Sequence, residues 1–352
     1  MNIANIFGRT APHARPSSTV PIGVAAPSNV WRELAVQDWI VLVYLFALLA
    51  FTVAGDGSRR TTALAYLSID ITAFAVAIGL ARGKIVTGTL GALVYRFGLF
   101  AGIFGSFSHL QYILPTARSV RLDAEIYAFD KLVFGFEPAE VFDRFVTTST
   151  VEWFSFFYFG YFFILAAHIF PFMFAVKNVR LVAELSFGIV ALFCVGHLLY
   201  IVVPGYGPYQ HLAGSFTNEL DGPTWWRLVR AAVDAGEVSA RTDIFPSLHT
   251  AVPVFLTLFA FRHRGRAPFR FTWPVLAFFT SQIVIATMYL RWHYLADILA
   301  GIVLATTAAM VSWRVAGWEE LRRVRSAIGP AFPPPLKLPA VARRARTRAI
   351  GA

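Results

Sequence analysis

Cysteine and charged residues are scarce in this chain. Its one cysteine among 352 residues, Cys194, lies in an apolar run, so the sequence excludes an intramolecular disulfide. Only 14% of the residues are charged and 57% are hydrophobic, with a mean hydropathy of +0.60, which is rare for a soluble domain of this length. Residues 1–35 are polar, rich in Pro and Ala, and lack the apolar segment of a signal peptide. We therefore expect a flexible cytoplasmic tail there and no cleavable signal.

Long apolar runs dominate the rest of the sequence. Each predicted run is long enough to cross a bilayer as a helix, which indicates an all-α polytopic membrane protein with about eight transmembrane helices. We expect two accessory transmembrane helices in 36–92, a six-helix catalytic membrane core in 93–316 and a basic cytoplasmic tail in 317–352. The predicted spans are 39–55, 62–81, 93–115, 153–176, 182–203, 246–262, 271–290 and 294–316.

The net charge of +11 is distributed unevenly along the chain. With eight spans and both ends inside, most basic residues fall on the cytoplasmic side, including the turn 262–266 and the tail 343–348, while most acids fall in outer loops. This is the positive-inside pattern, and it predicts a plasma-membrane protein with cytoplasmic termini and no nucleic-acid partner. Arginine outnumbers lysine by 27 to 4, which favours a GC-rich bacterial genome and hence the bacterial inner membrane.

Two predicted outer loops are long, at 116–152 and 204–245. The first mixes charges with aromatic residues and is expected to hold short interfacial helices. The second contains Trp-Trp-Arg-Leu-Val-Arg at 225–230, which is typical of an amphipathic helix at the level of the lipid headgroups. Long ordered loops beside a site commonly form its walls or its lid.

Two polar motifs each begin an apolar span. The segment 245–250 reads Phe-Pro-Ser-Leu-His-Thr, and the segment 293–297 reads His-Tyr-Leu-Ala-Asp. His293 follows His249 by 44 positions, which suits one helix across the bilayer and one helix back. Both histidines and Asp297 are therefore expected to meet at the extracytoplasmic face, which the charge distribution indicates independently.

This trio suits phosphoryl chemistry. His293 and Asp297 are four residues apart, so they share a helix face, and the carboxylate can orient the imidazole and stabilise its charged form. His293 is then fit to attack phosphorus and form a phosphohistidine, while His249 is fit to protonate the leaving oxygen. Ser247 and nearby backbone amides can bind phosphate oxygens, because two helix N-termini point at the site.

The same residues also allow interpretations that involve no catalysis. A histidine at a membrane interface often serves only as a hydrogen-bonding group, and a His-x-x-x-Asp pair also suits a metal, although no further acidic or cysteine ligand accompanies it. We therefore expect no metal and no cofactor. Arg241 and Arg291 are the nearest cations for a substrate phosphate, and Arg291 could alternatively anchor the chain at the headgroups.

At these motifs the sequence resembles the type 2 phosphatidic acid phosphatase superfamily, whose site is built from Pro-Ser-Gly-His and Arg-x5-His-x3-Asp. Residues 246–249 match the first motif with Leu248 in place of glycine, and His293 and Asp297 match the second. The resemblance covers about residues 93–316. It implies that His293 is the nucleophile, Asp297 its partner and His249 the acid.

Two departures narrow the resemblance. The family arginine would fall on Thr287, so this phosphate ligand is either absent or replaced by Arg291, and no Lys-x6-Arg-Pro element precedes the site. The loop 204–209 stands in its place. Phe-Pro-Ser-Leu-His, His-Tyr-x-x-Asp and the stretch Asp-Lys-Leu-Val-Phe-Gly at 130–135 are similar to the branch of inositol phosphorylceramide synthases and their bacterial relatives.

A headgroup pocket is expected from polar and aromatic residues at the outer ends of the spans and in the second loop. Because aromatic belts at a membrane interface produce a similar set, each residue is a candidate only. The candidates are Tyr206, Tyr209, His109, Tyr158 and His197.

Three functions remain open at this point. The first is a lipid phosphotransferase, resembling inositol phosphorylceramide synthase, that moves a phosphoryl group or phospho-headgroup from a phospholipid to a lipid or polyol hydroxyl. The second is a lipid phosphatase that uses water as the acceptor and acts on phosphatidate or a polyprenyl diphosphate. The third is a non-catalytic membrane transporter or scaffold. The membrane phospholipid, the acceptor and the bilayer are the expected partners, and the oligomeric state stays open.

Overall fold

The computed structural model describes residues 29–176, 178–237 and 242–332, and all regular elements in these ranges are helical. The helices are α1 (Val30–Glu33), α2 (Val36–Ala54), α3 (Arg60–Arg82), α4 (Gly88–Ala117), α5 (Asp123–Phe134), α6 (Pro138–Asp143), α7 (Thr148–Phe174), α8 (Val179–Val202), α9 (Pro208–His211), α10 (Trp225–Glu237), α11 (Leu248–Arg262), α12 (Phe269–Tyr289) and α13 (Leu295–Arg325), with a 3-10 turn, η2 (Ala213–Ser215).

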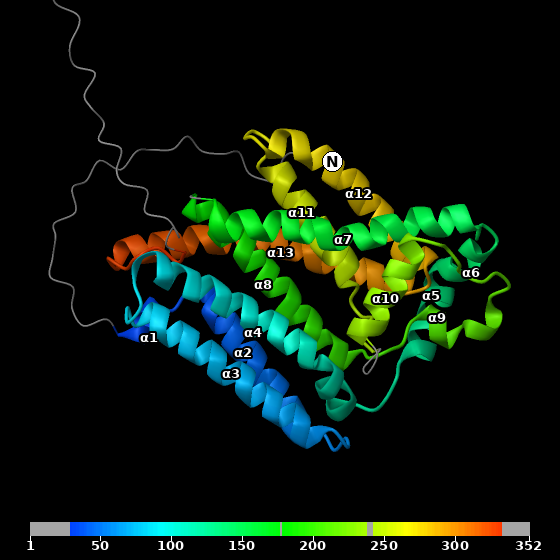
Figure 1. Ribbon diagram of the computed structural model, residues 1–352, viewed down its shortest axis with the longest axis horizontal. Coiled ribbons are helices and arrows are strands. Elements are labelled where there is room, and N and C mark those ends of the chain that lie inside the picture. Colours follow the sequence, from blue (N-terminus) through cyan, green and yellow to red (C-terminus); the bar gives the residue numbers. More distant parts are fainter. Residues whose placement is uncertain (1–28, 177, 238–241, 333–352) are drawn as a thin grey trace, which may run out of the picture.

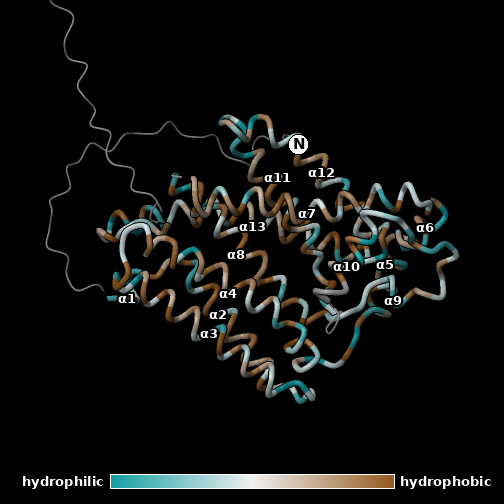
Figure 2. The backbone as a smooth tube through the Cα atoms, viewed as in Figure 1, coloured by the Kyte–Doolittle hydropathy of each residue, from teal (hydrophilic) through white to brown (hydrophobic). Residues whose placement is uncertain are grey.

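Seven of the described helices, α2, α3, α4, α7, α8, α12 and α13, are long and apolar enough to cross a membrane. This confirms the prediction of an all-α polytopic membrane protein, and Figure 2 shows hydrophobic colours along the long helices. The predicted span 246–262 differs, because α11 has 15 residues and is about 22 Å long against a hydrocarbon core of about 30 Å. Since α11 packs against α8, α12 and α13, it contacts protein over much of its length.

The long helices form two packed groups joined by α8. Helices α2, α3 and α4 pack on one another, while α7 and α13 pack beside the pair α11–α12. Helix α8 contacts members of both groups, and Figure 1 shows it crossing between them. A side chain at Gly188 on α8 would overlap the ring of Phe255 on α11, so glycine is required for this close approach.

Short helices gather at one end of the long bundle. Figure 1 shows α5, α6, α9 and α10 together at that end, where both long predicted outer loops lie. Each loop therefore contains short helices, as the sequence predicts for the first loop and for the segment at 225–230. Gly135 ends α5 in the left-handed conformation (φ 81°), which glycine adopts at little cost.

Both expected tails are shorter than the sequence indicates. Residues 29–35 contain α1 and pack on the bundle, and Arg323 donates a hydrogen bond to the carbonyl of Glu33 at 2.6 Å. At the other end α13 continues to Arg325, and Phe332 is buried against Tyr95. The expected tails at 1–35 and 317–352 need this correction, because polar side chains in both segments find buried partners. Residues 1–28 and 333–352 lie outside the described ranges.

Candidate active site

His293 lies in the turn between α12 and α13, and its ring faces Asp297 in the first turn of α13. The Nδ1 atom of His293 is 3.4 Å from Oδ2 of Asp297, and the same oxygen accepts the backbone N–H of Tyr294 at 2.9 Å. Both side chains are buried. The carboxylate thus holds the Nδ1 side of the imidazole, which leaves Nε2 for a substrate.

His249 lies in the first turn of α11 and is held by aromatic rings. Its ring stacks on Tyr158 at 4.5 Å between centroids and lies 4.3 Å from the ring of Tyr161, both on α7. Its Nε2 atom is buried, and no described residue forms a hydrogen bond with it. A buried imidazole nitrogen without a protein partner beside a cavity fits a group that exchanges a proton with a substrate.

Ser247 connects α11 to α13 instead of facing open space. Its hydroxyl caps α11 by accepting the N–H of Thr250 at 3.2 Å, and its own N–H donates to the carbonyl of Asp297 at 3.0 Å. A side chain at Gly301 on α13 would collide with the carbonyl of Ser247, so the two helices meet at this point. Ser247 therefore sets the relative position of His249 and Asp297, and its hydroxyl is fully buried.

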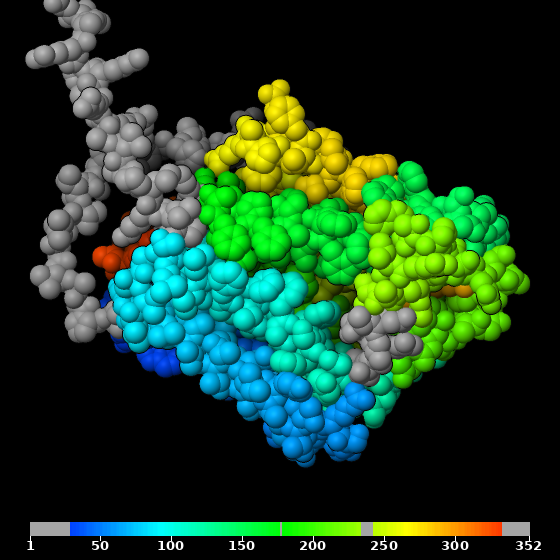
Figure 3. Space-filling view, in the orientation of Figure 1, coloured from blue at the N-terminus to red at the C-terminus, as the bar shows by residue number. Residues whose placement is uncertain are grey.

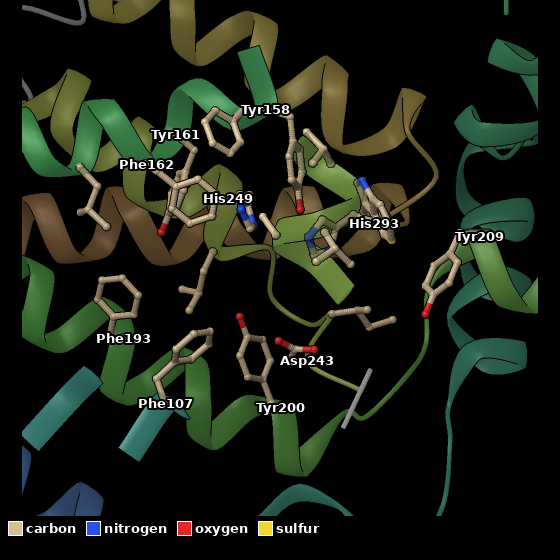
Figure 4. A pocket seen from close by; sticks show the side chains of 18 of the residues that line it. Phe107, Tyr158, Tyr161, Phe162, Phe193, Tyr200, Tyr209, Asp243, His249 and His293 are labelled. Carbon is tan, nitrogen blue, oxygen red and sulfur yellow. The ribbon is translucent and has the colours of Figure 1, made fainter. Parts of the chain in front are cut away.

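A cavity of about 220 Å³ brings the two histidines together. It lies between α4, α7, α8 and α10 and is mostly apolar; Figure 4 shows His249 and His293 on its wall, and it lies beneath the seam between α4 and α7 in Figure 3. Of the predicted headgroup residues it includes Tyr158, Tyr206 and Tyr209. Further aromatic lining residues are Phe104, Phe107, Phe159, Tyr161, Phe162, Phe193, Tyr200 and Trp292.

Asp123, in the first outer loop, organises the cavity mouth. Its carboxylate accepts the backbone N–H groups of Tyr206 at 2.9 Å and Gly207 at 2.9 Å, and the hydroxyl of Tyr294 donates to it at 3.2 Å. Gly207 has φ 90°, and a side chain there would collide with the carbonyl of Trp292. One carboxylate therefore fixes both the loop 204–209 and the residue that follows His293.

Asp130, in α5, caps the helix that carries Asp297. Its carboxylate accepts the first free N–H groups of α13, from Leu295 at 2.7 Å and from Ala296 at 3.1 Å. Glu137 is buried next to it and caps α6 by accepting the N–H of Ala139 at 3.2 Å. Burial raises the pKa of Glu137 to about 8, and the neighbouring Asp130 carboxylate adds to the rise. Glu137 is therefore mainly protonated at neutral pH.

Arg291 is not placed where the sequence argument needs it. Its guanidinium donates to Asp143 Oδ1 at 2.7 Å and to the carbonyl of Asn218 at 2.6 Å, and it stacks over Phe216 at 3.9 Å. It lines a neighbouring hollow that shares Tyr209 and Trp292 with the cavity that contains the histidines, and it does not line that cavity itself. The correction has a physical reason: φ of 67° at Arg291 turns the chain, and Asp143 offers a buried partner. Arg241 lies outside the described residues.

Two predicted headgroup histidines also lie elsewhere. His109 on α4 bonds to Asp70 on α3, with Nδ1 2.8 Å from Oδ2, and its ring stacks on Tyr66. His197 on α8 is fully buried, and its Nδ1 is 2.9 Å from the hydroxyl of Tyr44. Neither residue lines the cavity, so both link helices of the bundle.

Sequence reasoning missed the acids that build the site. Asp123, Asp130 and Asp143 were visible as a cluster of acids in the first outer loop, yet nothing in the local sequence shows which backbone amides they meet. Asp243 was also missed; it lines the cavity together with both histidines. The proximity of Asp243 to the Pro-Ser-x-His motif was the available signal.

Comparison with known proteins assigns the chain to a family. The profile of the PAP2 superfamily matches residues 124–311, more than half of the chain, and that range contains both motifs. No curated protein and no solved structure shows a significant match. Together with the buried His293–Asp297 pair and His249 on one cavity, the match identifies the family: this chain is a membrane-spanning member of the PAP2 superfamily.

Proposed function

We propose that this protein is a lipid phosphotransferase, similar to inositol phosphorylceramide synthase, that moves a phospho-headgroup from a phospholipid to a lipid or polyol hydroxyl. The observation that carries the proposal is the cavity itself, because it holds His293 and His249 among aromatic residues at the end of the bundle where the short helices gather. Superfamily membership supports a phosphatase-type lipid enzyme. The mostly apolar cavity favours an organic acceptor over bulk water.

The reaction proceeds in two displacements. In the first, Nε2 of His293 attacks phosphorus, the bond from phosphorus to the leaving oxygen breaks, and His249 gives its proton to that oxygen. In the second, neutral His249 takes the proton of the acceptor hydroxyl, whose oxygen attacks phosphorus and breaks the P–N bond to His293. Asp297 stabilises the charge on the His293 ring in both steps.

Hydrolysis is the alternative outcome of the same chemistry. If water replaces the acceptor hydroxyl in the second displacement, the protein is a lipid phosphatase acting on phosphatidate or a polyprenyl diphosphate. The family description favours this reading. A non-catalytic transporter or scaffold would give the His293–Asp297 pair no chemical task.

The proposal includes an orientation and a metal-independent reaction. Both termini would be cytoplasmic and the cavity would open at the extracytoplasmic face of the plasma membrane, because the basic residues concentrate on the other side. Within the described residues no group of three or more His, Cys, Asp or Glu side chains is arranged to hold a metal ion. We expect activity to survive EDTA; loss of activity that a divalent ion restores would contradict a metal-free reaction.

Lipid mass spectrometry tests the function. Purified protein is incubated with mixed phospholipids and ceramide, and lipid products and free phosphate are measured. A new headgroup-bearing lipid that is absent with His293→Ala supports transfer, whereas free phosphate with dephosphorylated lipid and no transfer product supports the phosphatase. The matched control is His211→Ala, which changes an exposed histidine on α9 away from the cavity.

A further inference from the structure

A carboxylate that neither motif contains faces the reaction cavity. Asp243 precedes α11 and lines the cavity with His249 and His293, and Figure 4 shows its carboxylate near Tyr200. Among the described lining residues it is the sole acidic group, and none of them is Lys or Arg. Among the described lining groups, a substrate in this cavity therefore meets two imidazoles, aromatic rings and one acid.

The surroundings make the charge of Asp243 important. Burial raises the pKa of its carboxyl group, while the nearby His293 acts in the opposite direction. In a mostly apolar cavity, charges interact more strongly than in water, and a buried carboxylate is costly unless hydrogen-bond donors or a positive charge satisfy it. The Asp243 carboxylate would repel a second negative charge on the substrate, and it would bind a substrate group that donates a hydrogen bond.

We propose that Asp243 determines substrate specificity by admitting phosphodiester lipids whose headgroup carries O–H or N–H donors and by disfavouring phosphomonoesters. The inference rests on the proposed function and names the class of its donor substrate. A phosphodiester carries one negative charge, which one protonated imidazole balances. A phosphomonoester carries about −1.5 to −2 near neutral pH, so its additional charge is left facing the carboxylate.

The size of the cavity agrees with this assignment. At about 220 Å³ it is smaller than the roughly 300–1,000 Å³ typical of pockets for drug-sized ligands, so it suits a headgroup and leaves the lipid tails outside. With the phosphate at the two histidines, the headgroup would extend toward another part of the wall. Asp243 is the one carboxylate on the described wall, and Figure 4 shows it near Tyr200.

Substrate competition in one reaction tests the role of Asp243. Wild-type protein and Asp243→Asn are each given phosphatidylinositol, phosphatidylethanolamine, phosphatidylcholine and phosphatidate in mixed micelles that also contain ceramide as the acceptor, and consumption of each phospholipid is measured. The wild type is expected to prefer the donor-bearing phosphodiesters, and Asp243→Asn to reduce their preference over phosphatidate by about tenfold or more. Because the readout is a ratio within one sample, partial misfolding of a variant does not change it. Asp221→Asn, at an exposed acid of the same loop, is the matched control.

Each outcome decides the inference. If the inositol lipid is consumed fastest, the group that Asp243 binds is a polyol. If the ethanolamine lipid is consumed fastest, that group is an ammonium. The choline lipid, whose headgroup has no N–H or O–H donor, should be consumed more slowly than both. An unchanged ratio in Asp243→Asn, or faster use of phosphatidate by the wild type, overturns the inference while His293-dependent turnover keeps the proposed function. If the wild type consumes none of the lipids, both fail.

Discussion

At the scale of single residues, one carboxylate oxygen of Asp297 faces two neighbouring groups. Its Oδ2 accepts the N–H of Tyr294 and faces Nδ1 of His293, while Oδ1 is buried without a partner among the described residues. The 3.4 Å separation from His293 is long for a hydrogen bond, and such contacts commonly shorten when substrate binds. The side chain of Asp297 is therefore positioned to stabilise the positive charge that develops on the His293 ring.

Replacing Asp297 with Asn tests this assignment. Asn retains an acceptor for Tyr294, so the turn should be preserved, but it removes the charge that stabilises the imidazolium. We expect kcat to fall by about 10²- to 10⁴-fold with little change in KM, by analogy with the acid of hydrolase triads. Steady-state kinetics on the identified lipid measures both constants. A variant with at least half of the wild-type kcat would remove Asp297 from the mechanism.

Glu137 predicts how stability depends on pH. Its folded-state pKa of about 8 lies above the ordinary value of 4.5, so the folded protein keeps a proton that the unfolded chain loses. The contribution of this proton to the free energy of unfolding is complete below about pH 4.5. It is lost as pH rises through about 8, which lowers the free energy of unfolding by an amount on the order of a few kcal/mol. We expect Glu137→Gln to flatten this decline, as measured by thermal unfolding in detergent. An equal decline in wild type and variant would show that another group is responsible.

At the scale of elements, acids of the first outer loop hold the segments that come later in the chain. Asp123 fixes the loop 204–209, Asp130 caps α13, and Asp143 accepts the backbone N–H groups of Thr217 and Asn218. Glu152, at the start of α7, accepts the first N–H groups of α10. Hydrogen bonds from several donors and the charge of Arg291 keep the pKa of Asp143 below its usual value despite burial. These carboxylates accept hydrogen bonds from backbone groups that would otherwise be unsatisfied.

Asp130→Ala tests whether capping of α13 positions the reacting groups. Loss of the cap should destabilise the protein by about 1–2 kcal/mol and lower kcat beyond the loss of folded protein, because α13 carries Asp297. Asp130→Asn, which keeps an acceptor, should recover part of kcat. Glu140→Ala is the control, since the hydrogen bonds of that acid go to Lys131 and Tyr127 instead of to α13. Equal effects at Asp130 and Glu140 would argue against a positioning role.

At the scale of the whole molecule, the arrangement places the cavity at one end of the helical bundle. Helix α11 leads away from that end and α12 returns to it, which brings His249 and His293 to the same level. The turn between α11 and α12 carries the arginines that predict a cytoplasmic location. The loop that contains η2 lies at the opposite end, beside the cavity.

Cysteine labelling in intact cells tests this orientation. Gly214 and Gly265 each have open space where a side chain would be built, so Gly214→Cys and Gly265→Cys should fold normally. A membrane-impermeant thiol reagent is expected to label Gly214→Cys from outside and Gly265→Cys only after permeabilisation. The native Cys194 is buried and should remain unlabelled. The reverse pattern would invert the proposed topology.

The sequence by itself determined the membrane-spanning class, the superfamily and the three residues that we propose for the reaction. Apolar runs can be read locally because every backbone group in a bilayer must be satisfied within its own helix. The spacing from His249 to His293 could also be read, since two helical crossings bring the chain back to the same face. The overestimated tails and the short α11 show the limit of such readings, because packing partners decide where helices end.

Only the tertiary structure decided which polar residues face the cavity. Arg291, His109 and His197 look like site residues in the sequence, but each has a closer partner in Asp143, Asp70 or Tyr44. Asp130 accepts the N–H of Leu295, 165 residues later in the chain, and Asp243 lines one cavity with residues of α4, α7 and α8. Side-chain partners that are far apart in the sequence depend on how the helices pack, and a local sequence pattern does not predict that packing.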